Sequence, residues 1–146
     1  MEQYYLDTSA ILPYYRDEVH SQLVQNFLDS LSSPVAISHL TEVEFASALS
    51  RLVRMDELDD AQAGVIDQAF AADRKSGLFR RVSFAVAHYN QAIKWLSLRN
   101  TPLRTLDTLH LAISNHGNLE IVTCDEILAK SAQKLGIAWK FLPDKL

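Results

Sequence analysis

Short apolar runs alternate along this chain with longer segments of helical periodicity. The runs predicted to be strands comprise residues 3–6, 35–38, 120–123 and 138–141. After the first run, apolar side chains recur at intervals of three and four residues, which is the spacing of one helix face. The members of that face are Val19, Leu23, Val24, Phe27, Leu28 and Leu31. A helix is therefore predicted between the first two strands.

Capping and breaking residues bound the other helices. Ser9 is the expected cap of a brief helical turn at Ala10, and Thr41 is the expected N-cap of a helix that reaches about Arg54. Further helices are predicted to follow the acidic residues 56–60 and to occupy residues 83–98, 104–116 and 125–135.

Strands that alternate with helices predict an α/β fold, with a small central parallel sheet flanked by helices. The long helical block between the second and third strands lies outside this alternation, so we expect a helical protrusion. No linker, repeat or low-complexity segment divides the sequence. Residues 1–146 are accordingly expected to form a single domain.

Charge and cysteine content limit the possible functions. The net charge is −4, from 14 basic and 18 acidic residues, so bulk charge would not hold a nucleic acid and any such contact must be local. Cys124 is the only cysteine, which excludes an internal disulfide or a thiolate metal cage and fits a reducing compartment. We find no leader pattern and no membrane-spanning run, and expect a cytoplasmic protein.

The candidate chemistry lies in four acidic residues that are far apart in the sequence. Asp7 follows the first predicted strand, Glu44 and Asp107 lie early in predicted helices, and Asp125 follows a later strand. Ligands of parallel α/β sheets bind outside the carboxyl ends of the strands. If these carboxylates meet there, a divalent cation would relieve their repulsion, and hard oxygen ligands favour Mg²⁺ or Mn²⁺.

Three of the four acids also have a simpler explanation. Asp7 could be a turn residue, and Asp125 could cap the helix that follows it. Thr41 and Glu44 have the T-x-x-E spacing of a capping box, in which Glu44 would fold back onto the Thr41 amide. Asp107 is harder to explain, because its neighbours Leu106, Leu109, Leu111 and Ala112 are expected to face the core. His110, three residues after Asp107, could bind metal, support a ligand or be a structural histidine.

Taken as a set, four blocks of the sequence resemble those of PIN-domain ribonucleases. The blocks are YYLDTSAIL, S-x-L-T-x-x-E from Ser38 to Glu44, LRTLDTLHLA and VTCDEILAKSAQKLGI, and they span residues 4–137. The similarity is closest to the VapC toxins of toxin-antitoxin pairs. It implies a PIN-like three-layer fold.

The resemblance also implies a function. The implied function is that of an Mg²⁺- or Mn²⁺-dependent endoribonuclease toxin, which hydrolyses RNA with a metal-activated water and is inhibited by a cognate antitoxin. Asp7, Glu44, Asp107 and Asp125 would form the catalytic and metal-binding quartet, and T-x-x-E spacing is the reason to choose Glu44 over Glu42. Thr8, Ser9 and Arg104 are the expected substrate-binding residues, and a homodimer is expected. Side chains available for a dimer face or an antitoxin groove are Tyr14, Tyr15, Phe45, Leu49, Phe79 and Trp95.

Two other functions compete with this one. A haloacid-dehalogenase-like phosphatase would carry D-x-D-x-T after the first strand, but the second aspartate of that motif is replaced here by Ser9. The alternative that stays open is a catalytically silent PIN-like adaptor, which binds RNA or protein and uses the acids only as caps and turn residues.

Overall fold

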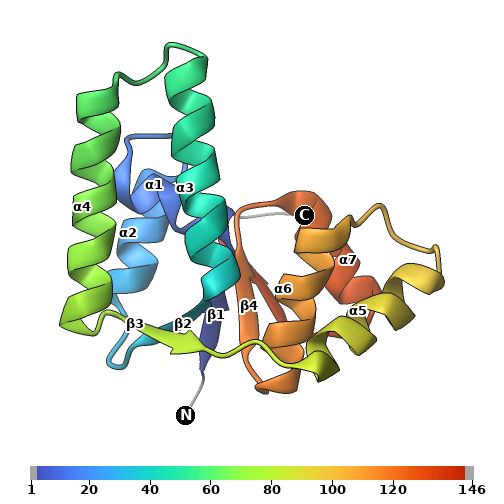
Figure 1. Cartoon of the computed structure of the whole chain (residues 1–146). Coiled ribbons are helices and arrows are strands. Elements are labelled where there is room, and N and C mark those ends of the chain that lie inside the picture. The colour runs from blue at the N-terminus through green and yellow to red at the C-terminus, as the bar shows by residue number, and fades with distance from the viewer. Residues whose placement is uncertain (1–2, 144–146) are drawn as a thin grey trace.

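The computed structural model describes residues 3–143, with strands and helices in regular alternation at both ends of the chain (Figure 1). The strands are β1 (Tyr4–Leu6), β2 (Val35–Ser38), β3 (Phe79–Val82), β4 (Glu120–Thr123) and β5 (Trp139–Phe141). The helices are the 3₁₀ turn η1 (Thr8–Ala10), α1 (Leu12–Tyr15), α2 (Ser21–Asp29), α3 (His39–Arg54), α4 (Asp60–Ser76), α5 (Val86–Ser97), α6 (Thr105–His116) and α7 (Glu126–Lys134). Within residues 3–143, no helix is long and apolar enough to cross a membrane.

The five strands form one parallel sheet in the order β3-β2-β1-β4-β5, which confirms the predicted fold class. Successive side chains of a strand face opposite sides. Leu6 accordingly packs with Val24 and Phe45 from α2 and α3, whereas Tyr5 packs with Leu111 and Leu128 from α6 and α7. The sheet is therefore the middle of three layers, with α1 to α4 on one side and α5 to α7 on the other (Figure 1).

The strand β3 was not predicted, and it corrects the expectation of an unbroken helical block. Phe79 is buried, but Arg80 and Arg81 are exposed, so the segment lacks the continuous apolar run of the other strands. Its ladder partner is β2, with Val35 opposite Phe79, and no other strand of residues 3–143 lies beyond it. An edge strand that faces solvent needs few apolar residues, which explains the missed prediction.

The helical protrusion is the α3–α4 hairpin, whose far end rises above the rest of the molecule (Figure 1). Helix α3 begins earlier than predicted, because Ser38 rather than Thr41 has the extended backbone of an N-cap. The hydroxyl of Thr41 instead accepts the Ser38 amide hydrogen at 3.2 Å. The predicted capping box of Thr41 and Glu44 is therefore wrong, and Glu44 lies in the second helical turn with its carboxylate available for other contacts.

Some apolar residues do not lie where the sequence analysis expected them. Val19 precedes α2 and is 88% exposed, and Leu106 is 44% exposed. Phe45, Leu49 and Phe79, which were considered for a partner surface, are core residues instead. Helix α5 presents several exposed apolar side chains, Val86, Tyr89, Ile93 and Leu96.

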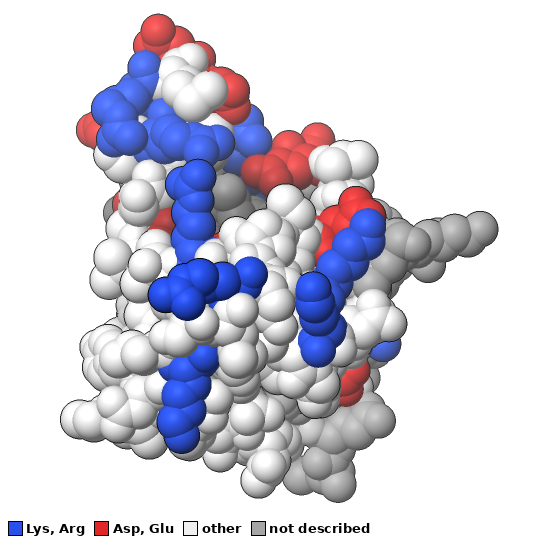
Figure 2. All heavy atoms as spheres, turned by 90° about the vertical axis from the view of Figure 1, so that its right-hand side faces the viewer, with Lys and Arg blue, Asp and Glu red and all other residues white. Residues whose placement is uncertain are grey.

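The side of the molecule that carries α5, α6 and α7 is largely uncharged (Figure 2). Lys and Arg side chains form a broken column down this face, and acidic side chains interrupt it mainly near the upper end of the view. Despite the net negative charge of the chain, basic groups are thus concentrated locally.

Candidate active site

The predicted site residues lie around the carboxyl edge of the sheet. Asp7 directly follows β1, and Asp125 follows β4, which is the hydrogen-bonded neighbour of β1. Glu44 comes from α3, which begins where β2 ends, and Asp107 lies in the first turn of α6. This edge is where parallel α/β sheets bind their ligands.

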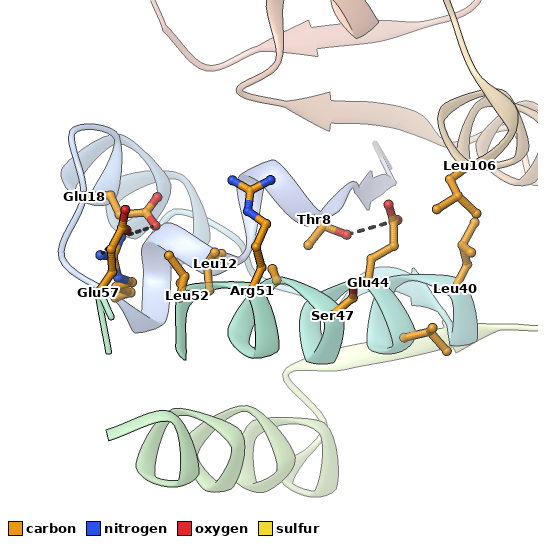
Figure 3. Close-up of a pocket in the computed structure, with 13 residues that line it drawn as sticks. Thr8, Leu12, Glu18, Leu40, Glu44, Ser47, Arg51, Leu52, Glu57 and Leu106 are labelled. Atoms are coloured by element: carbon orange, nitrogen blue, oxygen red, sulfur yellow. Dashed lines mark hydrogen bonds and ion pairs between the residues drawn. The ribbon is translucent and has the colours of Figure 1, made fainter. Parts of the chain in front are cut away.

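A groove of about 710 Å³ leads away from this edge along α3 (Figure 3). Glu44, Ser47, Ala48 and Arg51 line it from one face of the helix, and Thr8 lines it from the turn after β1. At its far end the Arg16 guanidinium is engaged by Glu18 at 3.0 Å and Glu57 at 3.4 Å. The remaining lining residues are Leu12, Leu40, Val43, Leu52 and Leu106.

Arg51 is the basic side chain of this groove that remains available. It extends from α3 into the groove between the acidic end and the Arg16 cluster (Figure 3). Among residues 3–143 it forms no salt bridge. Glu44 and Arg51 are seven residues apart, which corresponds to about 10 Å along a helix axis. The groove therefore presents a carboxylate at one end and a cation two turns away.

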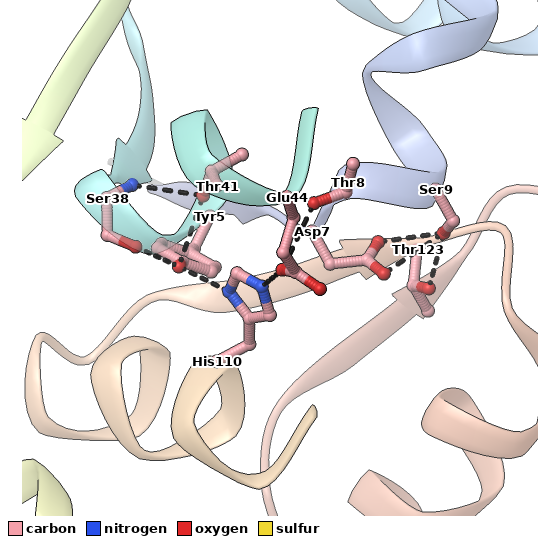
Figure 4. A network of polar contacts seen from close by, with 9 residues as sticks. All are labelled: Tyr5, Asp7, Thr8, Ser9, Ser38, Thr41, Glu44, His110 and Thr123. Carbon is pink, nitrogen blue, oxygen red and sulfur yellow. Dashed lines mark hydrogen bonds and ion pairs between the residues drawn. The ribbon is translucent and has the colours of Figure 1, made fainter. Parts of the chain in front are cut away.

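The Glu44 carboxylate is held by residues from two other elements (Figure 4). The Thr8 hydroxyl donates to its Oε1 at 3.2 Å, and Nε2 of His110 contacts the same oxygen. Glu42 points elsewhere, because Arg81 contacts its carboxylate at 2.7 and 2.8 Å and Arg74 at 3.1 Å. Of the two neighbouring acids on α3, only Glu44 faces the other predicted site residues.

Asp7 is buried, with 6% of its surface exposed. Its side chain does not cap η1; the Ser9 hydroxyl instead donates to the carboxylate, 2.9 Å from Oδ1 and 3.1 Å from Oδ2. The predicted role of Ser9 as a helix cap is wrong, since its oxygen accepts the Cys124 amide hydrogen at 3.0 Å and lies 3.1 Å from the Thr123 hydroxyl. Ser9 thus joins the acid that follows β1 to the end of β4.

Burial is the main reason that the pKa of Asp7 is raised to about 6. The nearby charge of Asp125 adds to the rise, whereas His110 and the hydroxyls of Ser9 and Thr123 oppose it. The charged form of this carboxylate is therefore poorly stabilised by the protein alone.

Asp107 is half-buried, and burial is again the first cause of its raised pKa, followed by the charges of Asp125 and Glu44. His110 and Arg104 act in the opposite direction. Arg104 occupies the N-cap position of α6 and is exposed, so it can reach a ligand at this edge.

Asp125 does cap α7, as the simpler explanation required. Its Oδ1 accepts the amide hydrogens of Ile127 at 2.9 Å and Leu128 at 3.3 Å. Both bonds involve one oxygen, and Oδ2 accepts no hydrogen bond from the part of the chain that the structure describes. The same residue raises the pKa of both Asp7 and Asp107, so capping does not remove it from the acidic cluster.

The four carboxylates therefore share one electrostatic environment, although no three acidic, histidine or cysteine side chains within residues 3–143 are grouped closely enough to form a metal site by themselves. Mg²⁺ commonly keeps several water ligands and takes only one or two direct carboxylates. A buried carboxylate with a raised pKa and further carboxylate oxygens nearby fits such a cation. Asp7 and Asp107 would hold it, with Glu44 and Asp125 within reach of its waters.

Sequence reasoning missed two parts of this site. The groove residues Ser47 and Ala48 carry no motif, and only their helical spacing relative to Glu44 could have indicated a shared face. Tyr5 was assigned only to a strand, yet its hydroxyl lies 2.6 Å from His110 Nδ1. No sequence signal marks this contact across 105 positions.

Several solved structures have the same architecture as this protein. No curated protein matches the sequence. The structure is similar to the sarcin–ricin loop cleaving toxin VapC20 of Mycobacterium tuberculosis, with a TM-score of 0.69 and 16% identity, covering 93% of this chain and 97% of that one. It is also similar to FitAcB of Neisseria gonorrhoeae, with a TM-score of 0.70 and 21% identity, covering 96% and 98% of the two chains.

A third similar structure is DNA-bound VapBC2 of Rickettsia felis, with a TM-score of 0.70 and 15% identity, covering 94% of this chain and 97% of that one. At these identities the likeness establishes the fold. The family model for the PIN domain matches residues 4–134, which is most of the sequence. The chain belongs to the PIN domain family.

Proposed function

We propose that this protein is a Mg²⁺- or Mn²⁺-dependent endoribonuclease that acts as the toxin of a toxin-antitoxin pair. The observation that supports the proposal is that Asp7, Glu44, Asp107 and Asp125 come from separate segments near the carboxyl edge of the sheet, where the charge of Asp125 acts on both Asp7 and Asp107. Burial, and to a smaller extent repulsion, raise the pKa of two of these carboxylates, and a bound cation would oppose that effect. Membership of the PIN family is the independent support.

The protein residues would divide the work of phosphodiester hydrolysis. A bound cation would supply the charge that favours ionisation of the attacking water and stabilises the phosphate. Asp7 and Asp107 would hold the cation, while Glu44 and Asp125 would orient water. Ser9 fixes the Asp7 carboxylate in the required direction. The products would carry 5′-phosphate and 3′-hydroxyl ends.

The RNA strand would lie along the α3 groove. Arg51 would bind a backbone phosphate away from the scissile one, and Arg104 would bind a phosphate at the acidic edge. Thr8 also lines the groove, and its hydroxyl donates to Glu44 at 3.2 Å. Both arginines are exposed, as a phosphate contact requires.

The proposed protein partners are a cognate antitoxin and a second copy of the chain, in the cytoplasm. Similar structures described as VapBC and FitAB complexes support the antitoxin. The exposed apolar side chains of α5, among them Val86 at 73% and Ile93 at 60% exposure, support a protein contact on that helix. Analytical ultracentrifugation tests the homodimer, which substitution of Ile93 by Glu should weaken.

RNA cleavage with a matched pair of variants tests the proposed activity. Single-stranded RNA should be cut in the presence of Mn²⁺ by the wild type and by Asp67→Asn, an exposed control on α4, but not by Asp7→Asn or in EDTA. Cleavage that persists in Asp7→Asn would refute the assigned site. RNA binding without any cleavage would instead support the silent adaptor.

A further inference from the structure

A buried chain of polar groups runs behind Glu44 (Figure 4). The Tyr5 hydroxyl lies 2.8 Å from the Ser38 hydroxyl and 2.6 Å from Nδ1 of His110, and the other ring nitrogen of His110 contacts Glu44. Tyr5, Ser38 and His110 are all at most 2% exposed. These residues come from β1, the end of β2 and α6, so the chain links three elements to α3.

The hydrogen-bonding capacity of each group fixes the direction of this chain. An ionised carboxylate can only accept, so Nε2 of His110 carries the hydrogen that is donated to Glu44. When this is the only ring hydrogen, Nδ1 accepts and the Tyr5 hydroxyl donates to it. The Tyr5 oxygen in turn accepts from the Ser38 hydroxyl. Burial raises the pKa of Tyr5, which keeps its proton available for this bond.

This series of hydrogen bonds leaves one Glu44 oxygen for other ligands. Both donors to this carboxylate, Thr8 Oγ1 and His110 Nε2, contact Oε1. Oε2 accepts no hydrogen bond from the residues for which the structure gives positions. A glutamate side chain has several rotatable bonds and is 22% exposed here, so it would otherwise sample several orientations.

His110 itself is unsuited to react with a substrate. Its side chain is 2% exposed, and both ring nitrogens already have partners inside the protein. Its effect must therefore be exerted through the carboxylate that it contacts. Partners of this kind orient metal ligands in many proteins, and their loss typically reduces metal affinity or activity by about 10- to 100-fold.

We propose that His110 is a positioning residue, held as the Nε2–H tautomer by Tyr5 and Ser38, which orients Glu44 so that Oε2 faces the Asp7 and Asp107 side of the site. This proposal rests on the proposed function for its catalytic consequence. The tautomer and the hydrogen-bond order are properties of the protein alone and can be measured without metal or RNA.

Imidazole nitrogen NMR on the metal-free full-length protein tests the tautomer. In the wild type, His110 should carry a single ring hydrogen, on Nε2. In Tyr5→Phe, Glu44 still keeps the hydrogen on Nε2, but Nδ1 loses its donor, so the Nδ1 resonance should shift. An Nδ1–H ring, a doubly protonated ring or a tautomer mixture in the wild type would overturn the assigned chain, as would an unchanged spectrum in Tyr5→Phe.

Mn²⁺ titration and cleavage kinetics test the positioning role. His110→Leu should weaken Mn²⁺ binding and lower kcat by about tenfold or more with little change in KM, whereas His110→Gln should recover part of both because its amide can donate to Glu44. His88→Gln replaces another buried histidine, whose Nδ1 accepts the Ala85 amide hydrogen at 3.0 Å, and should leave both unchanged. Melting curves will show whether each variant is folded.

The two proposals fail in different ways. Wild-type Mn²⁺ affinity and kcat in a folded His110→Leu variant would overturn the positioning role while leaving the nuclease intact. Equal losses in His110→Leu and His110→Gln would also overturn it, because a general packing defect predicts that result. A wild type that binds no Mn²⁺ and cuts no RNA would refute the proposed function, and the NMR result would still decide the hydrogen-bond order.

Discussion

Ser9 and Thr123 lie with their hydroxyl oxygens 3.1 Å apart, although 114 positions separate them in the sequence. This contact joins the turn after β1 to the last residue of β4. Because Ser9 also donates to Asp7 and accepts from the Cys124 amide, one side chain determines both the local backbone geometry and the orientation of the buried carboxylate.

Ser9→Ala should therefore affect stability and pH dependence together. Loss of these hydrogen bonds should lower the free energy of unfolding by about 1 to 2 kcal/mol. Because the Ser9 hydroxyl lowers the pKa of Asp7, its removal should raise that pKa further and move the acid limb of Mn²⁺-dependent cleavage to higher pH. Urea unfolding and pH–rate profiles measure the two effects. Ser76→Ala, at the exposed end of α4, should show neither, and equal behaviour of the two variants would contradict the role of Ser9.

The metal-free protein should lose stability as the pH rises from about 4 to about 6. Burial raises the pKa of Asp7 from 3.8 to about 6, so the folded state binds a proton more tightly than the unfolded state. The stabilisation is complete below the unfolded pKa and is lost as pH rises through the folded pKa, with an upper magnitude of about 3 kcal/mol.

Urea unfolding in EDTA across this pH range measures the loss, and Asp7→Asn should show a shallower dependence. Asp107, whose pKa is also raised, adds a contribution of the same sign. A slope that is identical in the wild type and in Asp7→Asn would contradict the burial of a titrating Asp7 carboxylate.

Mg²⁺ or Mn²⁺ at millimolar concentration should raise the melting temperature at neutral pH. A cation that binds only the folded state stabilises it by mass action, and here it also relieves the repulsion among the carboxylates. Differential scanning fluorimetry with and without metal measures the rise, which Asp7→Asn should abolish and Asp67→Asn should retain. An equal rise in both variants would place the stabilising metal elsewhere.

Arg51→Ala should weaken RNA binding without removing the metal site. Arg51 lines the α3 groove and forms no salt bridge within the described residues, whereas Arg54 bonds to Ser50 at 2.8 Å and does not line that groove. Loss of one phosphate contact should reduce the slope of log affinity against log salt by about 0.7 for a single strand. Fluorescence anisotropy in several salt concentrations, with Arg54→Ala as the control, measures this slope. Identical slopes for the two variants would exclude the groove as the RNA path.

The sequence predicted the parts of the fold that carry strong local patterns. The runs predicted at 3–6, 35–38, 120–123 and 138–141 contain β1, β2, β4 and β5. The side chains of β1, β2 and β4 are mostly buried between the helical layers, and those of the edge strand β5 are only partly covered. β3 was missed because an edge strand with Arg80 and Arg81 on its surface lacks such a run. The start of α3 was misplaced because both Ser38 and Thr41 are good capping residues, and backbone geometry decides between them.

The four acidic residues of the candidate site could be proposed from the sequence, but their contacts could not. Four carboxylates near strand ends and helix starts indicate a shared edge, since parallel strands end on the same side. The choice of Glu44 over Glu42 depended on motif spacing, whereas the structure separates them by their partners, His110 for one and Arg81 for the other. Such pairings bring together residues from different layers, so local periodicity holds no information about them.

Anomalous diffraction from crystals soaked in Mn²⁺ tests the central claim most directly. The account predicts a Mn²⁺ peak bounded by Asp7, Glu44, Asp107 and Asp125, at least one of which is a direct ligand, and loss of that peak in Asp7→Asn. A metal bound only at other acidic residues, or these four carboxylates found apart with no metal among them, would contradict it.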